Sequence, residues 1–236
     1  TQYYAKMRTE FDAGLRALDG IVALTETDLA GFSQYNHTTK IWNPLTIVPD
    51  GRADLSQHTI ALTSRIAIEH KGLDLALAFA AKLPHDWQLA IAGGGTDSDV
   101  SRFHSLVEQN HVADKLIYRG ALKDEALKKH YRAASIFLQT SRWEGLPLVL
   151  AEAMSFGLPV VAMYNTGSAE VLESGKYGLI TPATDVNALY DAIRPLLNNI
   201  QLREEYAQRS LQRVEDFKIA PILAQWEAIL SPTFDN

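Results

Sequence analysis

One segment decides the fold: Ser141-Arg142-Trp143-Glu144-Gly145-Leu146-Pro147-Leu148-Val149-Leu150-Ala151-Glu152-Ala153-Met154-Ser155-Phe156-Gly157-Leu158-Pro159. An apolar strand is expected just before it, at 136–138, and another begins at Pro159. Between them, Glu144-Gly145 suits a tight turn, Pro147 suits the first position of a helix, and Gly157 suits the residue that ends one. Strand, helix and strand in this order indicate a βαβ unit with parallel strands.

The same pattern extends outward from this segment in both directions. Strands are expected at 59–63, 88–92, 116–118, 136–138, 159–163 and 178–180, and helices at 72–83, 100–110, 123–134, 147–156, 168–173, 186–197 and 202–215. The strands are almost wholly apolar, as in parallel sheets that are buried on both faces. The prediction is an α/β fold with a Rossmann-like, doubly wound parallel sheet, in which ligands bind at the carboxyl ends of the strands.

The first fifty residues have a different organisation. An amphipathic helix is expected at 3–18, a short strand at 21–24, a helix capped by Thr25 or Thr27, and a strand at 40–42. Val48-Pro49-Asp50-Gly51 has the residues of a turn and is the best candidate for a linker. The predicted domains are therefore 1–50 and 51–236.

Composition excludes several classes of function. The 236 residues carry a net charge of −6 and no cysteine, which argues against nucleic-acid binding and excludes thiolate metal sites and cysteine nucleophiles. The seven histidines do not form an HExxH or H-x-E pattern, so we expect no metal site. No apolar run is long enough to cross a bilayer and no signal peptide opens the sequence, which predicts a cytoplasmic protein. The first residue is Thr1, which suggests a fragment.

The helix after the turn offers an anion site. The backbone N–H groups of Leu148 and Val149 lie in its first turn, where they lack intrahelical acceptors and the helix dipole adds positive charge. Glu152 lies in an apolar run, where a carboxylate is costly unless a partner such as a ligand binds it. The alternative is that Glu144 caps the helix and Glu152 interacts with charges at the surface.

Two other strand ends carry candidate binding residues. Arg65 and Lys71 follow one strand, and a guanidinium with an ammonium suits a diphosphate, although both could be solvated surface charges. Gly93, Gly94 and Gly95 follow the next strand, where missing side chains let the backbone approach a ligand closely. A glycine turn after a strand is also common without a ligand.

Taken together, these motifs resemble the family 4 glycosyltransferases. The resemblance covers Thr59 to Leu197 and rests on motifs in the family's order: Arg65 with Lys71-Gly72, Gly93 to Gly95, Tyr118-Arg119-Gly120, Glu144 with seven residues before Glu152, Gly167 to Glu170, and Tyr177 to Ile180. It implies the C-terminal, donor-binding half of a GT-B fold. It also implies transfer of a hexose from a UDP- or GDP-sugar, with retention of anomeric configuration and without a metal.

The resemblance also assigns roles to residues. Arg65 and Lys71 would neutralise the diphosphate and the charge on the leaving group, and Glu144 would contact the transferred sugar near the reacting centre. Glu152 would bind the ribose hydroxyls. The turn formed by Gly145, Leu146, Pro147, Leu148 and Val149 would offer backbone donors, and Gly93 and Gly94 would approach the donor. Gly120, Ala121 and Leu122 would flank the base. Pro147 departs from the family's usual glycine and has no N–H, so the contact would move to Leu148 or Val149.

Residues 1–50 resemble the end of the family's N-terminal domain, whose remainder would hold the saccharide or lipid-linked acceptor. We therefore expect this chain to bind a donor but to turn over slowly or not at all, and its apolar N-terminal surface to promote self-association. The resemblance further suggests synthesis of cell-surface polysaccharide or glycolipid at the cytoplasmic face of a membrane.

Other functions remain open at this stage. A nicotinamide-dependent oxidoreductase is disfavoured because Gly93-Gly94-Gly95 lacks the G-x-G-x-x-G spacing. A binding-only module would retain Glu152, Arg65 and Lys71 but could dispense with Glu144. A sugar-nucleotide epimerase would share the architecture, and analysis of products would distinguish it from a transferase.

Overall fold

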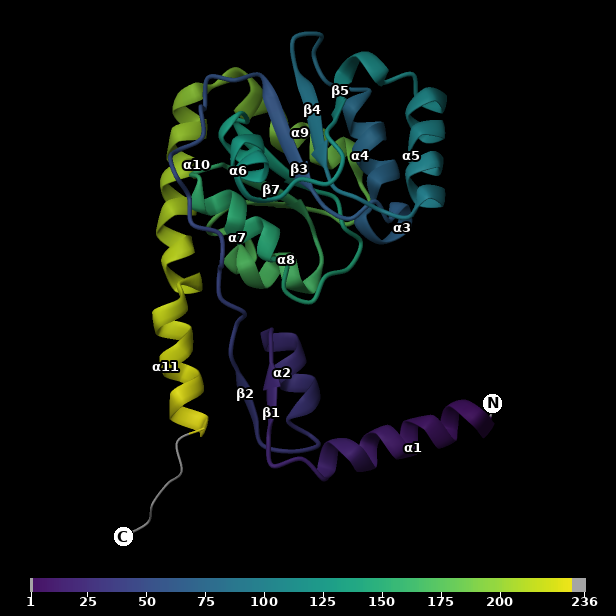
Figure 1. The fold of residues 1–236 in the computed structure, drawn as a ribbon, viewed down its shortest axis with the longest axis vertical. Helices are drawn as coiled ribbons and strands as arrows, with labels where there is room; N and C mark the ends of the chain where they lie inside the picture. Colours follow the sequence, from purple (N-terminus) through teal and green to yellow (C-terminus); the bar gives the residue numbers. More distant parts are fainter. Residues whose placement is uncertain (1, 231–236) are drawn as a thin grey trace. The chain divides into compact units, whose positions relative to one another are not determined.

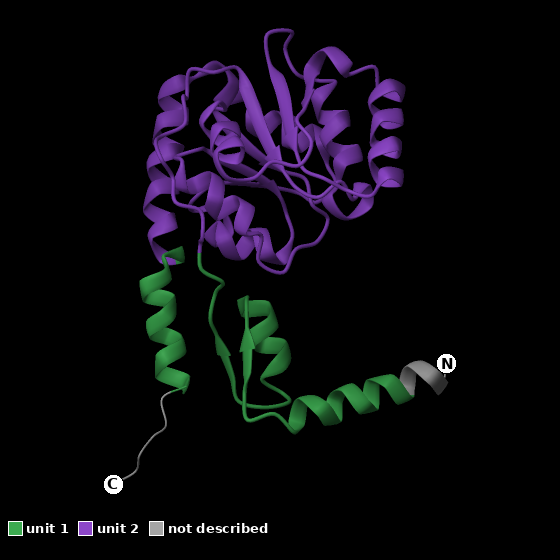
Figure 2. Ribbon diagram, viewed as in Figure 1, with its two compact units in different colours: residues 1–44, 217–236 green, residues 45–216 purple. Residues whose placement is uncertain are grey.

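The computed structural model describes residues 2–230, which form two compact units (Figure 2). The larger unit comprises residues 45–216. The smaller unit comprises 1–44 and 217–236. The sequence places the boundary a few residues later, at the turn around Pro49, and assigns the C-terminal residues to the larger domain.

The larger unit is built on a six-stranded parallel sheet in the order β5-β4-β3-β6-β7-β8 (Figure 1). Its strands are β3 (Thr59–Thr63), β4 (Gln88–Ala92), β5 (Leu116–Tyr118), β6 (Ile136–Gln139), β7 (Val160–Met163) and β8 (Leu179–Thr181). The order of strands reverses between β3 and β6, which are neighbours in the sheet although strands β4 and β5 lie between them in sequence. This reversal point is where ligands bind in doubly wound folds. The predicted Rossmann-like fold is confirmed.

Helices cover both faces of the sheet. They are α3 (Ile68–Lys71), α4 (Leu73–Ala80), α5 (Asp97–Gln109), α6 (Asp124–Arg132), α7 (Leu148–Ser155), α8 (Thr166–Val171), α9 (Val186–Asn198) and α10 (Ile200–Arg213), with short 3₁₀ turns at Ala113–Lys115, Glu173–Gly175 and Val214–Phe217. One core joins α4, α5 and α9 to alternate strand residues such as Ile60, Leu62, Leu138 and Val161. The intervening residues, such as Ala61 and Phe137, point to the opposite face.

The smaller unit contains α1 (Gln2–Arg16), β1 (Ile21–Ala23), α2 (Glu26–Phe32), β2 (Thr38–Lys40) and α11 (Ile219–Leu230). β1 and β2 form a parallel pair, with Val22 opposite Thr39. The Thr25 hydroxyl caps α2 by accepting a hydrogen bond from the Asp28 N–H at 3.1 Å. Of the two predicted caps, Thr25 and Thr27, the structure thus uses Thr25. Trp42 stacks on Phe217 within this unit.

The elements differ from the expectations in several details. Helix α4 lies within the predicted range 72–83, but the short helix α3 before it was not predicted. Gly72 adopts a left-handed conformation that ends α3 and begins α4. Pro147 precedes α7 as its cap instead of occupying its first position. The strand predicted at 40–42 lies at 38–40, and helix α11 was not predicted.

Candidate functional site

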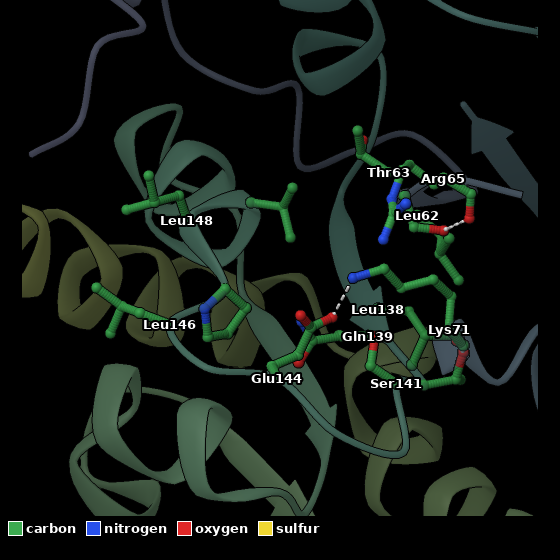
Figure 3. A pocket seen from close by; sticks show the side chains of 14 residues that line it. Leu62, Thr63, Arg65, Lys71, Leu138, Gln139, Ser141, Glu144, Leu146 and Leu148 are labelled. Carbon is green, nitrogen blue, oxygen red and sulfur yellow. Dashed lines mark hydrogen bonds and ion pairs between the residues drawn. The ribbon is translucent and has the colours of Figure 1, made fainter. Parts of the chain in front are cut away.

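A pocket of about 250 Å³ opens at the carboxyl ends of β3 and β6 (Figure 3). Its walls come from the ends of both strands, from Lys71 at the end of α3, and from the turn that leads into α7. The lining residues include Thr63, Ser64, Arg65, Lys71, Gln139, Thr140, Ser141, Glu144, Leu146, Pro147, Leu148 and Val149. The fold therefore brings together all three residues predicted to act on the donor, Arg65, Lys71 and Glu144.

Lys71 and Glu144 form an ion pair across this pocket. The Lys71 Nζ atom lies 2.7 Å from Glu144 Oε1, and the two side chains are only 14% and 12% exposed. Figure 3 shows them pointing toward one another. An ion pair so shielded from water is costly to break by removing one partner. Glu144 thus holds the Lys71 ammonium in place within the pocket.

Arg65 lies next to this pair but is not part of it. Its guanidinium is exposed and points toward the space beside Lys71 (Figure 3). Within residues 2–230, Arg65 makes no ion pair. The charged side chains of the pocket are therefore two cations and one carboxylate, which favours an anionic ligand.

A set of contacts holds α3 against the loop after β6. The Thr140 hydroxyl donates to the Lys71 carbonyl at 2.9 Å, and the Arg142 N–H donates to the His70 carbonyl at 3.0 Å. The Arg142 guanidinium makes a bidentate pair with Asp74, at 2.9 and 2.7 Å. Because these contacts flank Lys71 and Glu144, they fix the register of the two loops that carry the ion pair.

The turn from Glu144 to Pro147 packs tightly on the start of α8. A β-carbon added to Gly167 would lie 2.4 Å from the Gly145 carbonyl oxygen and 2.8 Å from Pro147 Cδ. Leu148 and Val149 then form the first turn of α7 and line the pocket. The sequence predicts that N–H groups of this first turn serve the ligand, and the two residues that carry them lie at the pocket.

Glu152 lies one turn further along α7 and is not among the residues that line the pocket. Its Oε2 atom accepts a hydrogen bond of 2.6 Å from the hydroxyl of Tyr131, which is fully buried and stacks on Phe156. Burial raises the pKa of Glu152, and the Tyr131 hydrogen bond partly opposes that increase. The sequence predicts a ligand as the partner of this carboxylate, and the structure shows that Tyr131 of α6 is one partner.

The glycines after β4 approach another part of the chain closely. A β-carbon on Gly93 would lie 1.6 Å from the Ser64 carbonyl oxygen, and one on Gly95 would lie 2.8 Å from the Ile66 carbonyl oxygen. Packing of the two strand ends is therefore sufficient to require glycine here, although close approach to a ligand was expected. Gly93 also donates to the Gly120 carbonyl at 2.7 Å. A β-carbon on Gly94 would lie 3.2 Å from the Ala121 side chain.

Leu122 lines a second pocket, of about 360 Å³, between β5 and α6. Arg119, Lys129 and the buried His130 line it as well. Burial lowers the pKa of His130 to about 4, and the charge of Arg119 adds to this effect. Of the residues predicted to flank the base, Leu122 alone lines this second pocket, and Gly120 and Ala121 adjoin Gly93 and Gly94.

The sequence reading missed the polar side chains in the pocket floor. Thr63 and Gln139 are the last residues of β3 and β6, and both line the pocket. The available signal was a glutamine at the end of the otherwise apolar strand Ile136-Phe137-Leu138-Gln139.

Residues 2–230 contain neither a candidate metal site nor a candidate membrane-spanning helix. No group of three or more His, Asp or Glu side chains in that range is placed to hold a metal ion. No helix in that range combines the length and the apolar character needed to span a membrane.

Comparisons with known proteins agree on one family. The sequence model of the family described as "Glycosyl transferases group 1" matches residues 51–213. An uncharacterized glycosyltransferase of Haemophilus influenzae is 30% identical over 221 residues, which are 90% of this chain and 61% of that protein. An exopolysaccharide phosphotransferase of Streptomyces coelicolor is 30% identical over 225 residues, which are 91% of this chain and 23% of that protein. The chain thus spans less than two thirds of either relative.

The fold is also shared with a solved structure. The Anabaena protein HepE in complex with UDP and glucose superposes with a TM-score of 0.84 at 19% identity, over 96% of this chain and 67% of that one. At this identity the similarity concerns the fold. It agrees with the predicted C-terminal half of a GT-B fold.

Proposed function

The chain belongs to the group 1 glycosyl transferases, and we propose that its larger unit binds a nucleotide-diphosphate sugar as the donor of a family 4, retaining hexosyltransferase. The observation that carries the proposal is the pocket itself. Arg65 and Lys71 follow β3 and Glu144 follows β6, and the three side chains line one pocket with the first turn of α7 although 73 residues separate Lys71 from Glu144.

The electrostatics of the pocket suit a diphosphate. Lys71 and Arg65 supply two positive charges, and the first turn of α7 adds N–H donors and the positive end of the helix dipole. Charge develops on the diphosphate as it leaves the sugar, and donors fixed in advance stabilise such charge with little reorganisation. These residues would thus bind the donor and promote departure of its nucleotide.

Glu144 and Glu152 have distinct roles in this proposal. Glu144 lies at the pocket wall, where its carboxylate can accept from hydroxyls of the transferred sugar once the phosphates attract Lys71. Glu152 uses Oε2 to accept from Tyr131, which leaves Oε1 for a ribose hydroxyl. The base would lie toward Gly120, Ala121 and Leu122.

The remaining parts of the proposal concern the whole protein. We expect the reaction to retain the anomeric configuration. We also expect no requirement for a metal, because two cations and a helix terminus already neutralise the diphosphate. The acceptor, a saccharide or a lipid-linked saccharide, would bind outside the larger unit. The exopolysaccharide enzyme among the relatives is consistent with a role in cell-surface polysaccharide synthesis at the cytoplasmic face of the membrane.

Calorimetric titration of the chain with UDP, GDP and ADP tests the donor site. We expect one nucleotide to bind with micromolar to millimolar affinity, and this binding to weaken roughly tenfold or more in Arg65→Ala and Glu152→Ala. Glu205→Ala, on the exposed surface of α10, is the matched control and should bind like the wild type. Absence of binding by all three nucleotides, or equal affinity in all variants, would contradict the proposal.

A further inference from the structure

Two polar side chains in the floor of the pocket have an atom without a hydrogen-bond partner. Within the described residues, the Thr63 Oγ1 and Gln139 Nε2 atoms are buried and make no hydrogen bond of normal geometry. The Thr63 side chain does lie near the Tyr131 hydroxyl, whose raised pKa it partly offsets. Ala61 pairs with Phe137 in the sheet, and Thr63 and Gln139 each follow two residues later. Because side chains alternate along a strand, both point to the same face of the sheet, at adjacent strand ends. Two groups with unused hydrogen-bonding capacity thus line one pocket.

Gln139 is held in place from one side. Its side chain is 4% exposed, and its Oε1 atom accepts from the Ser168 hydroxyl. Asn165 fixes that serine by accepting from its N–H at 2.8 Å, and donates in turn to the Ser141 carbonyl at 3.0 Å. One end of the Gln139 amide is therefore occupied and the other is available. A buried amide with an unpaired end is unfavourable, and a polar ligand that pairs with it would remove that cost.

The chemistry of these groups indicates which part of a donor they contact. They are neutral, whereas Lys71 and the exposed Arg65 carry the pocket's positive charges. A diphosphate would lose much of its hydration against a neutral amide, so it should stay with the cations. A sugar hydroxyl both donates and accepts, so it can pair with a threonine hydroxyl and with either end of an amide.

We propose that Thr63 and Gln139 form a recognition floor for hydroxyl groups of the transferred sugar and contribute to the choice of sugar. This inference rests on the proposed function, because it requires a nucleotide-diphosphate sugar in the pocket. It adds two residues that bind the sugar without touching the nucleotide.

The test compares a nucleotide with its sugar conjugate. Affinities for UDP and UDP-glucose, and for GDP and GDP-mannose, are measured by calorimetry on the wild type, Gln139→Met and Thr63→Val. We use the pair that the wild type binds. We expect the affinity for the free nucleotide to stay within twofold in both variants. The extra affinity that the sugar provides should fall roughly three- to tenfold, as expected for one neutral hydrogen bond.

Thermal stability provides a second measurement. Thr63→Val replaces the hydroxyl by a methyl group of similar size, so the melting temperature should change little. Gln139→Met also removes the acceptor of the Ser168 hydroxyl, so we expect some loss of thermal stability, and an unchanged affinity for the free nucleotide then shows that the pocket is intact. Gln139→Asn keeps the amide but shortens it, and should lose part of the sugar's contribution. Gln88→Met, at the opposite end of the sheet in β4, is the control and should leave both affinities unchanged.

The outcomes separate this inference from the proposed function. If the wild type binds neither nucleotides nor sugar nucleotides, the proposed function is wrong. If the wild type binds the nucleotide but the sugar adds no affinity, or if the variants retain the full contribution of the sugar, the recognition floor alone is wrong.

Discussion

At the scale of single residues, the pocket contains a carboxylate that competes with the proposed ligand. The Glu144 carboxylate lies 2.7 Å from the Lys71 ammonium and forms an ion pair with it. A diphosphate must share or displace that contact. Substitutions of the two partners in this ion pair should therefore change nucleotide affinity in opposite directions.

We expect Lys71→Met to weaken UDP or GDP binding roughly 10- to 100-fold, the usual range for losing a hydrogen bond to a charged group. Glu144→Gln should leave nucleotide affinity unchanged or raise it, because Lys71 is then available to the phosphates. Calorimetry of both variants checks this prediction. If nucleotide affinity falls as much in Glu144→Gln as in Lys71→Met, Glu144 does not compete with the phosphates for Lys71.

Tyr131 has a comparable role for Glu152. Its hydroxyl opposes the effect of burial, which raises the pKa of that carboxyl. In Tyr131→Phe the pKa of Glu152 should rise further, so that more of the protein holds a neutral Glu152. We expect the preference for UDP over 2′-deoxy-UDP, or for GDP over 2′-deoxy-GDP, to decrease in the variant and to recover as pH rises. Equal preference in variant and wild type at every pH would show that Tyr131 does not position Glu152.

At the scale of elements, the site depends on a break between two helices. Gly72 has a φ of 62° and separates α3 from α4, which places Lys71 at the end of one helix. A β-carbon on Gly72 would lie 2.0 Å from the Thr140 carbonyl oxygen. The close approach of α3 to β6, which brings Lys71 to Glu144, is therefore available only to glycine.

We expect Gly72→Ala to destabilise the protein by more than about 3 kcal/mol, because both the left-handed backbone and a backbone clash oppose it. Gly120 is the matched control, since it has a φ of 66° but no atom within 4 Å of an added β-carbon. Gly120→Ala should cost only about 1 kcal/mol. Urea unfolding of both variants measures the difference, and similar losses would exclude the clash as the cause.

At the scale of the whole molecule, a buried histidine links stability to pH. An unfolded chain protonates His130 near pH 6.5, whereas burial lowers its pKa to about 4 in the folded protein. Stability from this residue is thus fully present above pH 6.5 and is lost as pH falls toward 4. The difference between the two pKa values corresponds to about 3 kcal/mol in the free energy of unfolding.

We therefore expect the wild type to lose about 3 kcal/mol more stability between pH 7 and pH 4 than His130→Leu does. His85→Leu is the control, because the side chain of His85 is 97% exposed. Urea unfolding at several pH values tests the prediction. Parallel pH profiles for wild type and His130→Leu would show that His130 is not the responsible group.

The smaller unit exposes apolar side chains. Met7 and Leu18 are each 49% exposed and Phe11 is 59% exposed, along and just after α1. Apolar surface of this kind promotes association. We expect the chain to self-associate at micromolar concentrations and Phe11→Glu to reduce this association, as measured by sedimentation velocity. A monomeric wild type at high concentration would contradict this expectation.

The sequence by itself determined the sheet and most of its helices. Apolar strands alternating with helices of suitable length can be buried only as parallel βαβ units, so the pattern in the chain directly indicates the fold. It also placed Arg65 and Glu144 just after strands and Lys71 at the start of the helix that follows one of them, near the edge where ligands bind in a parallel sheet. Helix α11 was not predicted, although four of its apolar residues follow a helical spacing: Ile219, Ile222, Leu223 and Trp226.

Only the tertiary structure decided which side chains meet. The Lys71–Glu144 ion pair and the Tyr131–Glu152 hydrogen bond join residues far apart in sequence, and Thr63 and Gln139 line one pocket from two different strands. The order of strands places β3 beside β6, and no local pattern encodes that neighbourhood. Local propensity follows from a residue and its near neighbours, whereas the partner of a buried polar group depends on how distant elements pack.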